Sequence, residues 1–200
     1  MKKNIELEFR AEVLKNDFNN VLNILKKQGN LISKTKRLSV MFFGKFNNDC
    51  FDIRIRITNN ESEIVIKKGE LHSKDRSEYS QKINNDQFVG MVKLISKFGF
   101  RSKVGERETF NFQFPNQIIV SLVRAGDLSY LEIEKMTNEN NIRKDKEILY
   151  NLAKDLKVDV IEDKNKFDDF CKRLDNIVDW EFRDDYKCYR KLEKLLFSKF

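Results

Sequence analysis

Alternation of apolar and charged residues is the clearest pattern in the chain. Residues 5–10 read Ile-Glu-Leu-Glu-Phe-Arg, so apolar and charged positions alternate strictly. Residues two apart share a face of a β-strand, and this period therefore predicts a strand with one apolar and one charged face. The other segments for which we predict strands are 38–43, 52–57, 63–68, 76–83, 106–114, 118–123 and 130–136. Together these segments make eight strands, a number that can close a barrel.

Apolar residues at helical spacing separate several of these segments. Phe18, Val21 and Leu25 share one face of a helix, and Gly29 is placed to end it. The same spacing recurs in the ranges 86–98 and 138–156. We therefore expect an α+β fold, an eight-stranded antiparallel β-barrel with surrounding helices.

The C-terminal part of the chain lacks the strand pattern. Residues 161–200 have apolar positions at helical spacing, which predicts one or two helices. No linker rich in Pro, Gly or Ser precedes them. We expect residues 1–160 to form the main domain and residues 161–200 to be a helical extension packed on the barrel. A separately folded tail is the alternative.

Composition narrows the classes of function. The 200 residues include 39 Lys and Arg against 32 Asp and Glu, and this excess favours anionic partners. The three cysteines have no C-x-x-C spacing, and the single histidine, His72, excludes a multi-histidine metal site. No apolar run approaches the ~20 residues that a membrane span needs. We expect a cytoplasmic protein.

The charges on the predicted strands are sorted by sign. A half-solvated antiparallel sheet also alternates, so alternation alone identifies no site. However, Glu6 and Glu8 form one Glu-x-Glu pair near the start of the chain, and Glu132 and Glu134 form another on the last predicted strand. Like charges two apart repel unless a cation lies between them. Mg²⁺ prefers carboxylate oxygens, so these four residues are candidate metal ligands.

Basic residues dominate the strands between the two glutamate pairs. Arginine suits bidentate contact with phosphate, and lysine acts as a point charge. These basic residues could bind an anionic substrate next to the metal. The candidate substrate-binding residues are Arg10, Arg54, Arg56, Lys67, Arg76, Lys82 and Arg107.

These motifs, in this order, resemble the CYTH or triphosphate tunnel metalloenzyme superfamily over residues 5–156. That superfamily includes class IV adenylyl cyclases, thiamine triphosphatases, tripolyphosphatases and RNA 5′-triphosphatases. Its Glu-x-Glu-x-Lys signature resembles residues 6–10, with Arg10 in place of the lysine. The other matching segments are 53–56 (Ile-Arg-Ile-Arg), 64–69 (Ile-Val-Ile-Lys-Lys-Gly), 76–78 (Arg-Ser-Glu) and 132–134 (Glu-Ile-Glu).

Two positions depart from the superfamily's pattern. Its Lys-x-Arg motif is half present, because Arg107 matches but Gly105 replaces the lysine, for which Lys103 is a candidate substitute. The Asp expected about ten residues before the closing Glu-Ile-Glu is replaced by Ser121 or Leu122. One expected metal ligand is therefore missing.

The resemblance implies a triphosphate-processing enzyme that uses Mg²⁺ or Mn²⁺. We expect a triphosphatase that hydrolyses the terminal phosphate of tripolyphosphate, of a nucleoside triphosphate such as ATP, or of thiamine triphosphate, with Glu78 as the candidate that activates water. A class IV adenylyl cyclase is the alternative, and an RNA 5′-end is a further possible substrate. The alternative in which the protein is not an enzyme is a module that binds RNA or polyphosphate without turnover. We expect a monomer or a homodimer.

Overall fold

The computed structural model describes residues 5–47, 49–69 and 77–199, without the side chains of Glu6 and Lys199. Arg76 and His72 therefore lie outside the described residues. The eight main strands are β1 (Ile5–Val13), β2 (Asn30–Phe46), β3 (Asp49–Thr58), β4 (Glu61–Lys68), β5 (Ser77–Ile83), β6 (Arg101–Phe114), β7 (Ile118–Ala125) and β8 (Leu128–Thr137). The short strand β9 (Trp180–Phe182) was not predicted.

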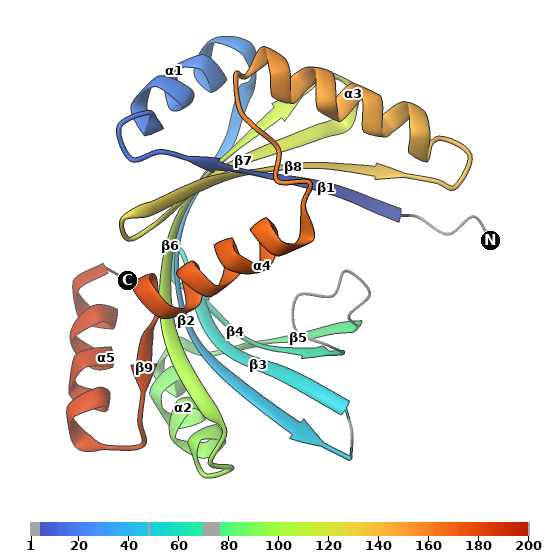
Figure 1. Cartoon of the computed structure of the whole chain (residues 1–200). Helices are drawn as coiled ribbons and strands as arrows, with labels where there is room; N and C mark the ends of the chain where they lie inside the picture. Colours follow the sequence, from blue (N-terminus) through green and yellow to red (C-terminus); the bar gives the residue numbers. More distant parts are fainter. Residues whose placement is uncertain (1–4, 48, 70–76, 200) are drawn as a thin grey trace. The chain divides into compact units, whose positions relative to one another are not determined.

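The α-helices are α1 (Phe18–Gln28), α2 (Phe88–Ser96), α3 (Ile142–Asp155), α4 (Lys164–Arg173) and α5 (Tyr186–Lys199). Helices separate the strands into groups along the chain: α1 lies between β1 and β2, α2 lies between β5 and β6, and α3 follows β8 (Figure 1). Short turns of other helix types are η1 (Asn85–Gln87), η2 (Pro115–Gln117) and the π-helical η3 (Leu174–Val178). The α+β class and the eight antiparallel strands are confirmed. In the described residues no helix combines the length and apolar character that crossing a membrane requires.

The strands form one sheet in the order β1-β8-β7-β6-β2-β3-β4-β5, and β9 pairs with β6. In the part of the chain that the structure describes, hydrogen bonds do not join β1 to β5, so the expected closure of the barrel by strand pairing is absent. The outer edge of β1 instead pairs with residues that follow α3. Val160 forms a bridge with Ala11, and the Ile161 amide donates a 2.7 Å hydrogen bond to the Arg10 carbonyl. The chain after α3 thus occupies the edge that closure would need.

The chain divides into two compact units, and β2 and β6 contribute to both. Unit 1 consists of residues 1–35 and 107–174. In it, α1 and α3 cover the apolar face of β1, β8 and β7 (Figure 1). Its core includes Leu25 from α1, Leu149 from α3 and Leu131 from β8, all fully buried. The opposite face of β1 and β8 carries Glu8, Arg10, Glu132 and Glu134.

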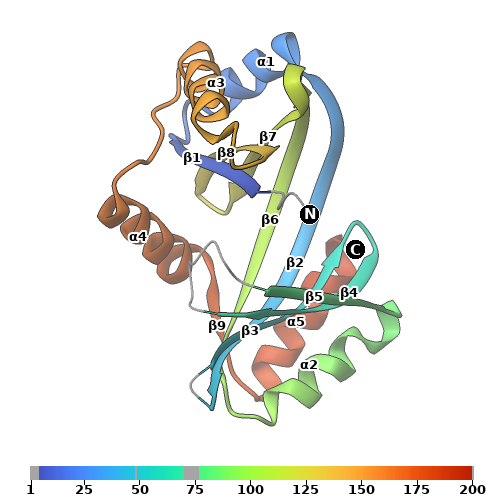
Figure 2. The same ribbon diagram turned by 90° about the vertical axis from the view of Figure 1, so that its right-hand side faces the viewer.

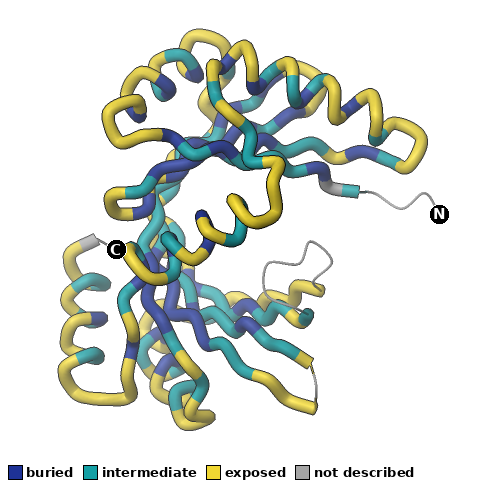
Figure 3. Tube along the Cα trace, in the orientation of Figure 1, coloured by how far each residue is buried: buried dark blue, intermediate teal, exposed yellow. Residues whose placement is uncertain are grey.

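Unit 2 consists of residues 36–106 and 175–200. Its core joins α2 and α5 to the apolar face of β2, β3 and β4, and Figure 2 shows both helices beside these strands. Phe42, Ile55, Phe88 and Leu192 are almost completely buried there. In each unit, buried positions gather on the strands and on the helix faces turned toward them (Figure 3). The alternation seen in the sequence therefore reflects helices that cover one face of the sheet.

Candidate functional site

The charged face of unit 1 brings glutamates from two segments far apart in the sequence onto adjacent strands. In the antiparallel pairing of β1 with β8, Glu8 lies opposite Glu134 and Arg10 lies opposite Glu132. Side chains directly opposite each other in such a pair have Cβ atoms about 5 Å apart. Glu6 occupies the next position of this face on β1 and pairs with Met136. Glu8, Glu132 and Glu134 therefore share one face of the sheet.

Arg10 is the cation at the centre of this face. Its Nε donates to Glu8 Oε1, and its Nη2 lies 3.0 Å from Glu132 Oε1. The Phe167 ring of α4 lies over the guanidinium, with its centroid 5.4 Å from Cζ. Burial lowers the pKa of Arg10, but the carboxylates of Glu132 and Glu8 outweigh burial and raise it overall. Arg10 therefore remains protonated between two carboxylates.

Tyr130 extends the cluster along β8. Its hydroxyl bonds the Arg107 side chain, and its ring contacts Phe170 of α4 edge-on at 5.3 Å between centroids. Burial, followed by the negative charge of Glu132, raises the pKa of Tyr130 to about 12. Tyr130 is therefore a neutral group at physiological pH, and it places Arg107 beside the glutamates.

Ser121 occupies the position on this face where the superfamily pattern has an aspartate. It lies directly opposite Glu132 in the β7–β8 pairing. Its hydroxyl donates a 2.8 Å hydrogen bond to Asn111 Oδ1, and Asn111 Nδ2 donates to Ser33 Oγ at 2.8 Å. Strand β7 thus supplies a neutral polar network instead of a further carboxylate.

The donor chemistry of this face fits Mg²⁺ or Mn²⁺. Glu8, Glu132 and Glu134 are oxygen donors, and small divalent cations are commonly bound by a few carboxylates with phosphate and water. In the described residues, no three His, Cys, Asp or Glu side chains are yet gathered in a metal-binding arrangement. Arg10 bonds two of these carboxylates, those of Glu8 and Glu132.

The charged face of unit 2 holds the basic residues of β3 and β4. The Asp52 carboxylate binds Arg54 with both oxygens, at 2.9 Å to Nε and 2.6 Å to Nη2. Only 1% of Asp52 is exposed, so the Arg54 guanidinium is held by a buried carboxylate. Arg56 Nε donates to Glu63 at 2.7 Å. Each arginine is thus positioned by a carboxylate on the same face.

Glu78 of β5 connects two of these cations. Its carboxylate lies 2.6 Å from Lys67 Nζ and 3.7 Å from Arg56 Nη2. Partial burial would raise the pKa of Glu78, but the hydrogen bond and charge of Lys67, with the charges of Arg56 and Arg54, lower it. Glu78 is therefore ionised at neutral pH and in contact with the phosphate-binding candidates.

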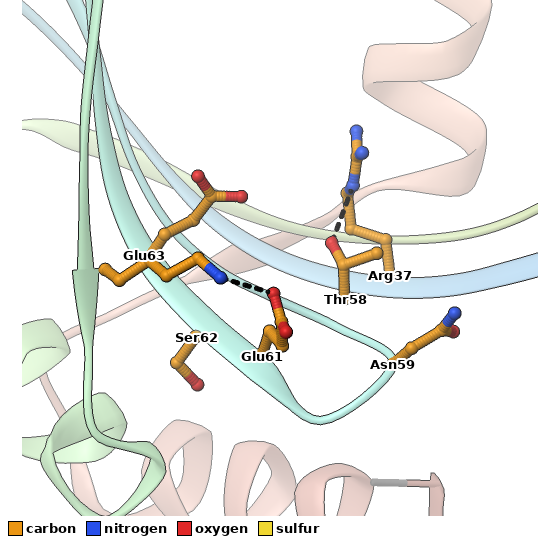
Figure 4. A pocket seen from close by; sticks show the side chains of 7 residues that line it. Arg37, Thr58, Asn59, Glu61, Ser62 and Glu63 are labelled. Carbon is orange, nitrogen blue, oxygen red and sulfur yellow. Dashed lines mark hydrogen bonds and ion pairs between the residues drawn. The ribbon is translucent and has the colours of Figure 1, made fainter.

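A cavity of about 400 Å³ opens on unit 2 at the turn between β3 and β4 (Figure 4). In Figure 4 the labelled Glu63 and Ser62 side chains point to opposite sides of β4, as the strand period requires. Lys82 lies 2.9 Å from Glu61 at this cavity and is 77% exposed. The cavity is lined by Arg37, Thr58, Asn59, Glu61, Ser62, Glu63 and Lys82. The lining thus mixes the carboxylates of Glu61 and Glu63 with the cations of Arg37 and Lys82.

Several expected residues lie together within one unit. The set in unit 1 is Glu8, Arg10, Arg107, Glu132 and Glu134, and the set in unit 2 is Arg54, Arg56, Lys67, Glu78 and Lys82. Lys103 does not join the basic face, because it is 2% exposed and donates to the Asp175 carbonyl.

The sequence analysis missed two residues that touch the site. Asp52 could have been found, because it precedes Arg54 by two positions and shares its strand face. Phe167 carried no such signal, because its contact with Arg10 depends on how α4 folds back onto β1.

Comparison with known proteins supports the fold. No protein-family model matches the sequence, and no curated protein matches it either. Solved structures do match. A conserved hypothetical protein from Pyrococcus furiosus has a TM-score of 0.58 at 18% identity over 78% of this chain and 95% of its own. An adenylate cyclase candidate from Vibrio parahaemolyticus has a TM-score of 0.54 at 16% identity, over 80% and 95% of the two chains.

A third neighbour is an adenylyl cyclase candidate from Hippeastrum described as having a dominant triphosphatase activity. It has a TM-score of 0.54 at 15% identity, and the match covers 80% of this chain and 91% of the other. At these identities the likeness concerns the fold. The chain therefore has a CYTH-type fold, the class to which its motifs pointed.

Proposed function

We propose that the chain is a divalent-metal-dependent enzyme that processes triphosphates, and that it acts mainly as a triphosphatase. The observation that carries the proposal is the register of β1 and β8, which sets Glu8 against Glu134 and Arg10 against Glu132 on one face. Carboxylates concentrated in this way favour a cation. Two proteins that share the fold are described as cyclase candidates, one of them with triphosphatase activity.

Each residue set has a distinct role in this proposal. Glu6, Glu8, Glu132 and Glu134 hold Mg²⁺ or Mn²⁺, which supplies positive charge to the phosphate oxygens when bound. Arg54, fixed by Asp52, binds phosphate oxygens in bidentate fashion, and Arg56 and Lys67 add further positive charge. Arg10, Arg76, Lys82 and Arg107 complete the proposed substrate-binding set.

Glu78 is the proposed general base. In its ionised form it accepts a proton from a water molecule, whose oxygen attacks the terminal phosphorus. The bond from that phosphorus to its bridging oxygen breaks, so that inorganic phosphate and a diphosphate form. Arg54 and Arg56 stabilise the charge on the departing diphosphate. Catalysis would then rest mainly on positioning and charge stabilisation.

The polar cavity beside Glu63 favours the cyclase as the second candidate. Arg56 bonds Glu63, and Glu63 lines the cavity, so phosphates bound at Arg56 would leave an adjoining space for an organic group. In a cyclase the ribose 3′-hydroxyl attacks the α-phosphorus, and pyrophosphate leaves. Hydrolysis of tripolyphosphate would need no such space.

Product analysis tests these alternatives. The purified protein is incubated with ATP, tripolyphosphate or thiamine triphosphate, with Mg²⁺ or Mn²⁺, and all products are resolved by chromatography. Release of free phosphate supports the triphosphatase, whereas cyclic AMP with pyrophosphate supports the cyclase. Glu134→Gln should abolish turnover, and Glu139→Gln, at an exposed position after β8, is the matched control. Salt-sensitive RNA or polyphosphate binding without turnover would instead indicate a binding module.

A further inference from the structure

Arg10 takes the place that a cation would occupy between the glutamates of unit 1. We propose that Arg10 is a built-in counter-ion of this cluster, that Phe167 holds it there, and that binding of a divalent metal requires Arg10 to leave Glu8 and Glu132. The inference rests on the proposed function only in taking this face as the metal site. It assigns to Arg10 and to α4 control over metal affinity.

Arg10 balances part of the negative charge of the glutamates on β1 and β8. Glu8 faces Glu134 across the ladder, and Glu132 lies two positions from Glu134 on the same strand face. Carboxylates so placed repel one another unless a positive charge lies among them. Arg10 supplies that charge by bonding Glu8 and Glu132 together. The face is therefore partly neutralised without metal.

Arg10 and a divalent cation would also compete for the same carboxylate oxygens. Arg10 bonds Oε1 of Glu8 and lies 3.0 Å from Oε1 of Glu132. A divalent cation bound by these oxygens would stand next to the guanidinium and repel it. The two cations are thus alternatives, and the free energy needed to displace Arg10 reduces the apparent metal affinity.

Contacts of α4 hold Arg10 in place. The Phe167 ring covers the guanidinium at 5.4 Å, a favourable cation–π distance. Two contacts anchor the same helix to the same face. Phe170 packs against Tyr130, and the Arg173 guanidinium binds both oxygens of Glu12 at 2.8 and 2.5 Å. When Arg10 leaves the cluster, α4 loses its contact at Phe167.

Arginine suits this role better than the lysine that the superfamily signature carries at the position. A planar guanidinium can bridge two carboxylates and stack under an aromatic ring at the same time. An ammonium group is a compact and strongly hydrated charge without a flat face to stack. Arg10→Lys should therefore weaken the competition without removing it.

Direct measurement of Mn²⁺ binding without substrate tests the proposal. Isothermal titration calorimetry compares the full chain with Arg10→Gln, Arg10→Lys and Phe167→Leu. We expect about tenfold tighter Mn²⁺ binding in Arg10→Gln, because two charge-assisted bonds no longer compete. Smaller gains are expected in Arg10→Lys and Phe167→Leu. The control is Lys154→Gln, which removes one exposed positive charge of α3 and should leave the affinity unchanged.

Thermal melting provides a second readout that does not depend on activity. In EDTA, Arg10→Gln should melt below the wild-type protein, because its glutamates lack their counter-ion. Added Mn²⁺ should raise its melting temperature by more than it raises that of the wild type. Phe167→Leu keeps all charges, so it still tests the proposal if Arg10→Gln folds only with metal.

The outcomes separate this inference from the proposed function. Equal or weaker Mn²⁺ binding in both Arg10→Gln and Phe167→Leu would overturn the counter-ion role, even if the wild-type protein hydrolyses triphosphates. Tighter binding in these variants, with no turnover of any triphosphate by the wild-type protein, would support the inference and remove the enzymatic proposal. Absence of Mn²⁺ binding in every protein tested would overturn both.

Discussion

Glu8 and Glu134 lie directly opposite each other on the adjacent antiparallel strands β1 and β8. Two carboxylates in this position normally destabilise a sheet, because their Cβ atoms are only about 5 Å apart. The repulsion is tolerable where a cation binds the pair. Several consequences of this arrangement, and of the ion pairs around it, can be measured.

Replacing Glu134 by Gln should affect stability and metal binding in opposite ways. The substitution removes a negative charge facing Glu8, so the metal-free protein should gain about 0.2 to 1 kcal/mol in free energy of unfolding. The same change should weaken Mn²⁺ binding. Urea denaturation in EDTA measures the first effect, and calorimetry measures the second. A loss of stability in EDTA would show that Glu134 makes a net favourable contact in the metal-free state.

The buried hydroxyl of Tyr130 should make stability fall in alkali. The folded-state pKa is about 12 and the ordinary value is 10, so the folded protein binds this proton more tightly than the unfolded chain does. Stability from this group is present below pH 10 and is lost as the pH rises toward 12, by about 2 to 3 kcal/mol. Tyr130→Phe should flatten that slope. Tyr79→Phe, at a 66% exposed position, should leave it unchanged.

Asp52→Asn should reduce both the stability and the substrate affinity of the protein. Arg54 would lose its bidentate partner, and we expect about 2 kcal/mol of destabilisation. Because Arg54 would no longer be fixed, KM for tripolyphosphate should rise more than kcat falls. A double-mutant cycle with Arg54→Gln measures the coupling between the two residues. Additive effects of the two substitutions would refute the positioning role of Asp52.

Glu78→Gln separates general-base catalysis from simple charge pairing. If Glu78 accepts the proton of water, kcat should fall by about 100-fold or more with little change in KM. Its lowered pKa keeps it ionised below the ordinary value of 4.5, so its ion pairs should stabilise the protein above that pH and be lost as the pH falls further. An unchanged kcat would assign Glu78 to the orientation of Lys67 and Arg56. Glu147→Gln, at an exposed position of α3, is the control.

The two lysines of the proposed substrate set should differ in importance. Lys67 is 23% exposed and lies 2.6 Å from Glu78, whereas Lys82 is 77% exposed and bonds Glu61 at the cavity. Charges in water are screened more strongly than partly buried ones. Lys67→Met should therefore lower kcat/KM for tripolyphosphate by about tenfold or more, and Lys82→Met by about twofold. Steady-state kinetics of both variants would show whether this order holds.

Local periodicity accounts for the part of the structure that the sequence could predict. The alternation in residues 5–10 specified which side chains of β1 share a face, because a strand has a period of two. The order of motifs then identified the fold. Register is a different matter. Nothing near Glu8 in the sequence specifies that Glu134 lies opposite it, because the pairing joins segments that are far apart in the sequence.

The sequence also did not predict the contacts that residues 161–200 make. The pattern in residues 161–200 indicated helices, and α4 and α5 confirm them. Periodicity showed that Phe167 lies on an apolar helix face but not that this face meets Arg10. The short strand β9 has only three residues, too few for its period to be recognised.

The most direct test of the central claim is phosphate release from tripolyphosphate with Mn²⁺ by the wild-type protein and by Glu134→Gln. We expect turnover by the wild type that EDTA abolishes, and none by the folded variant. Undiminished turnover by folded Glu134→Gln would contradict the assignment of the metal site to the glutamates of β1 and β8.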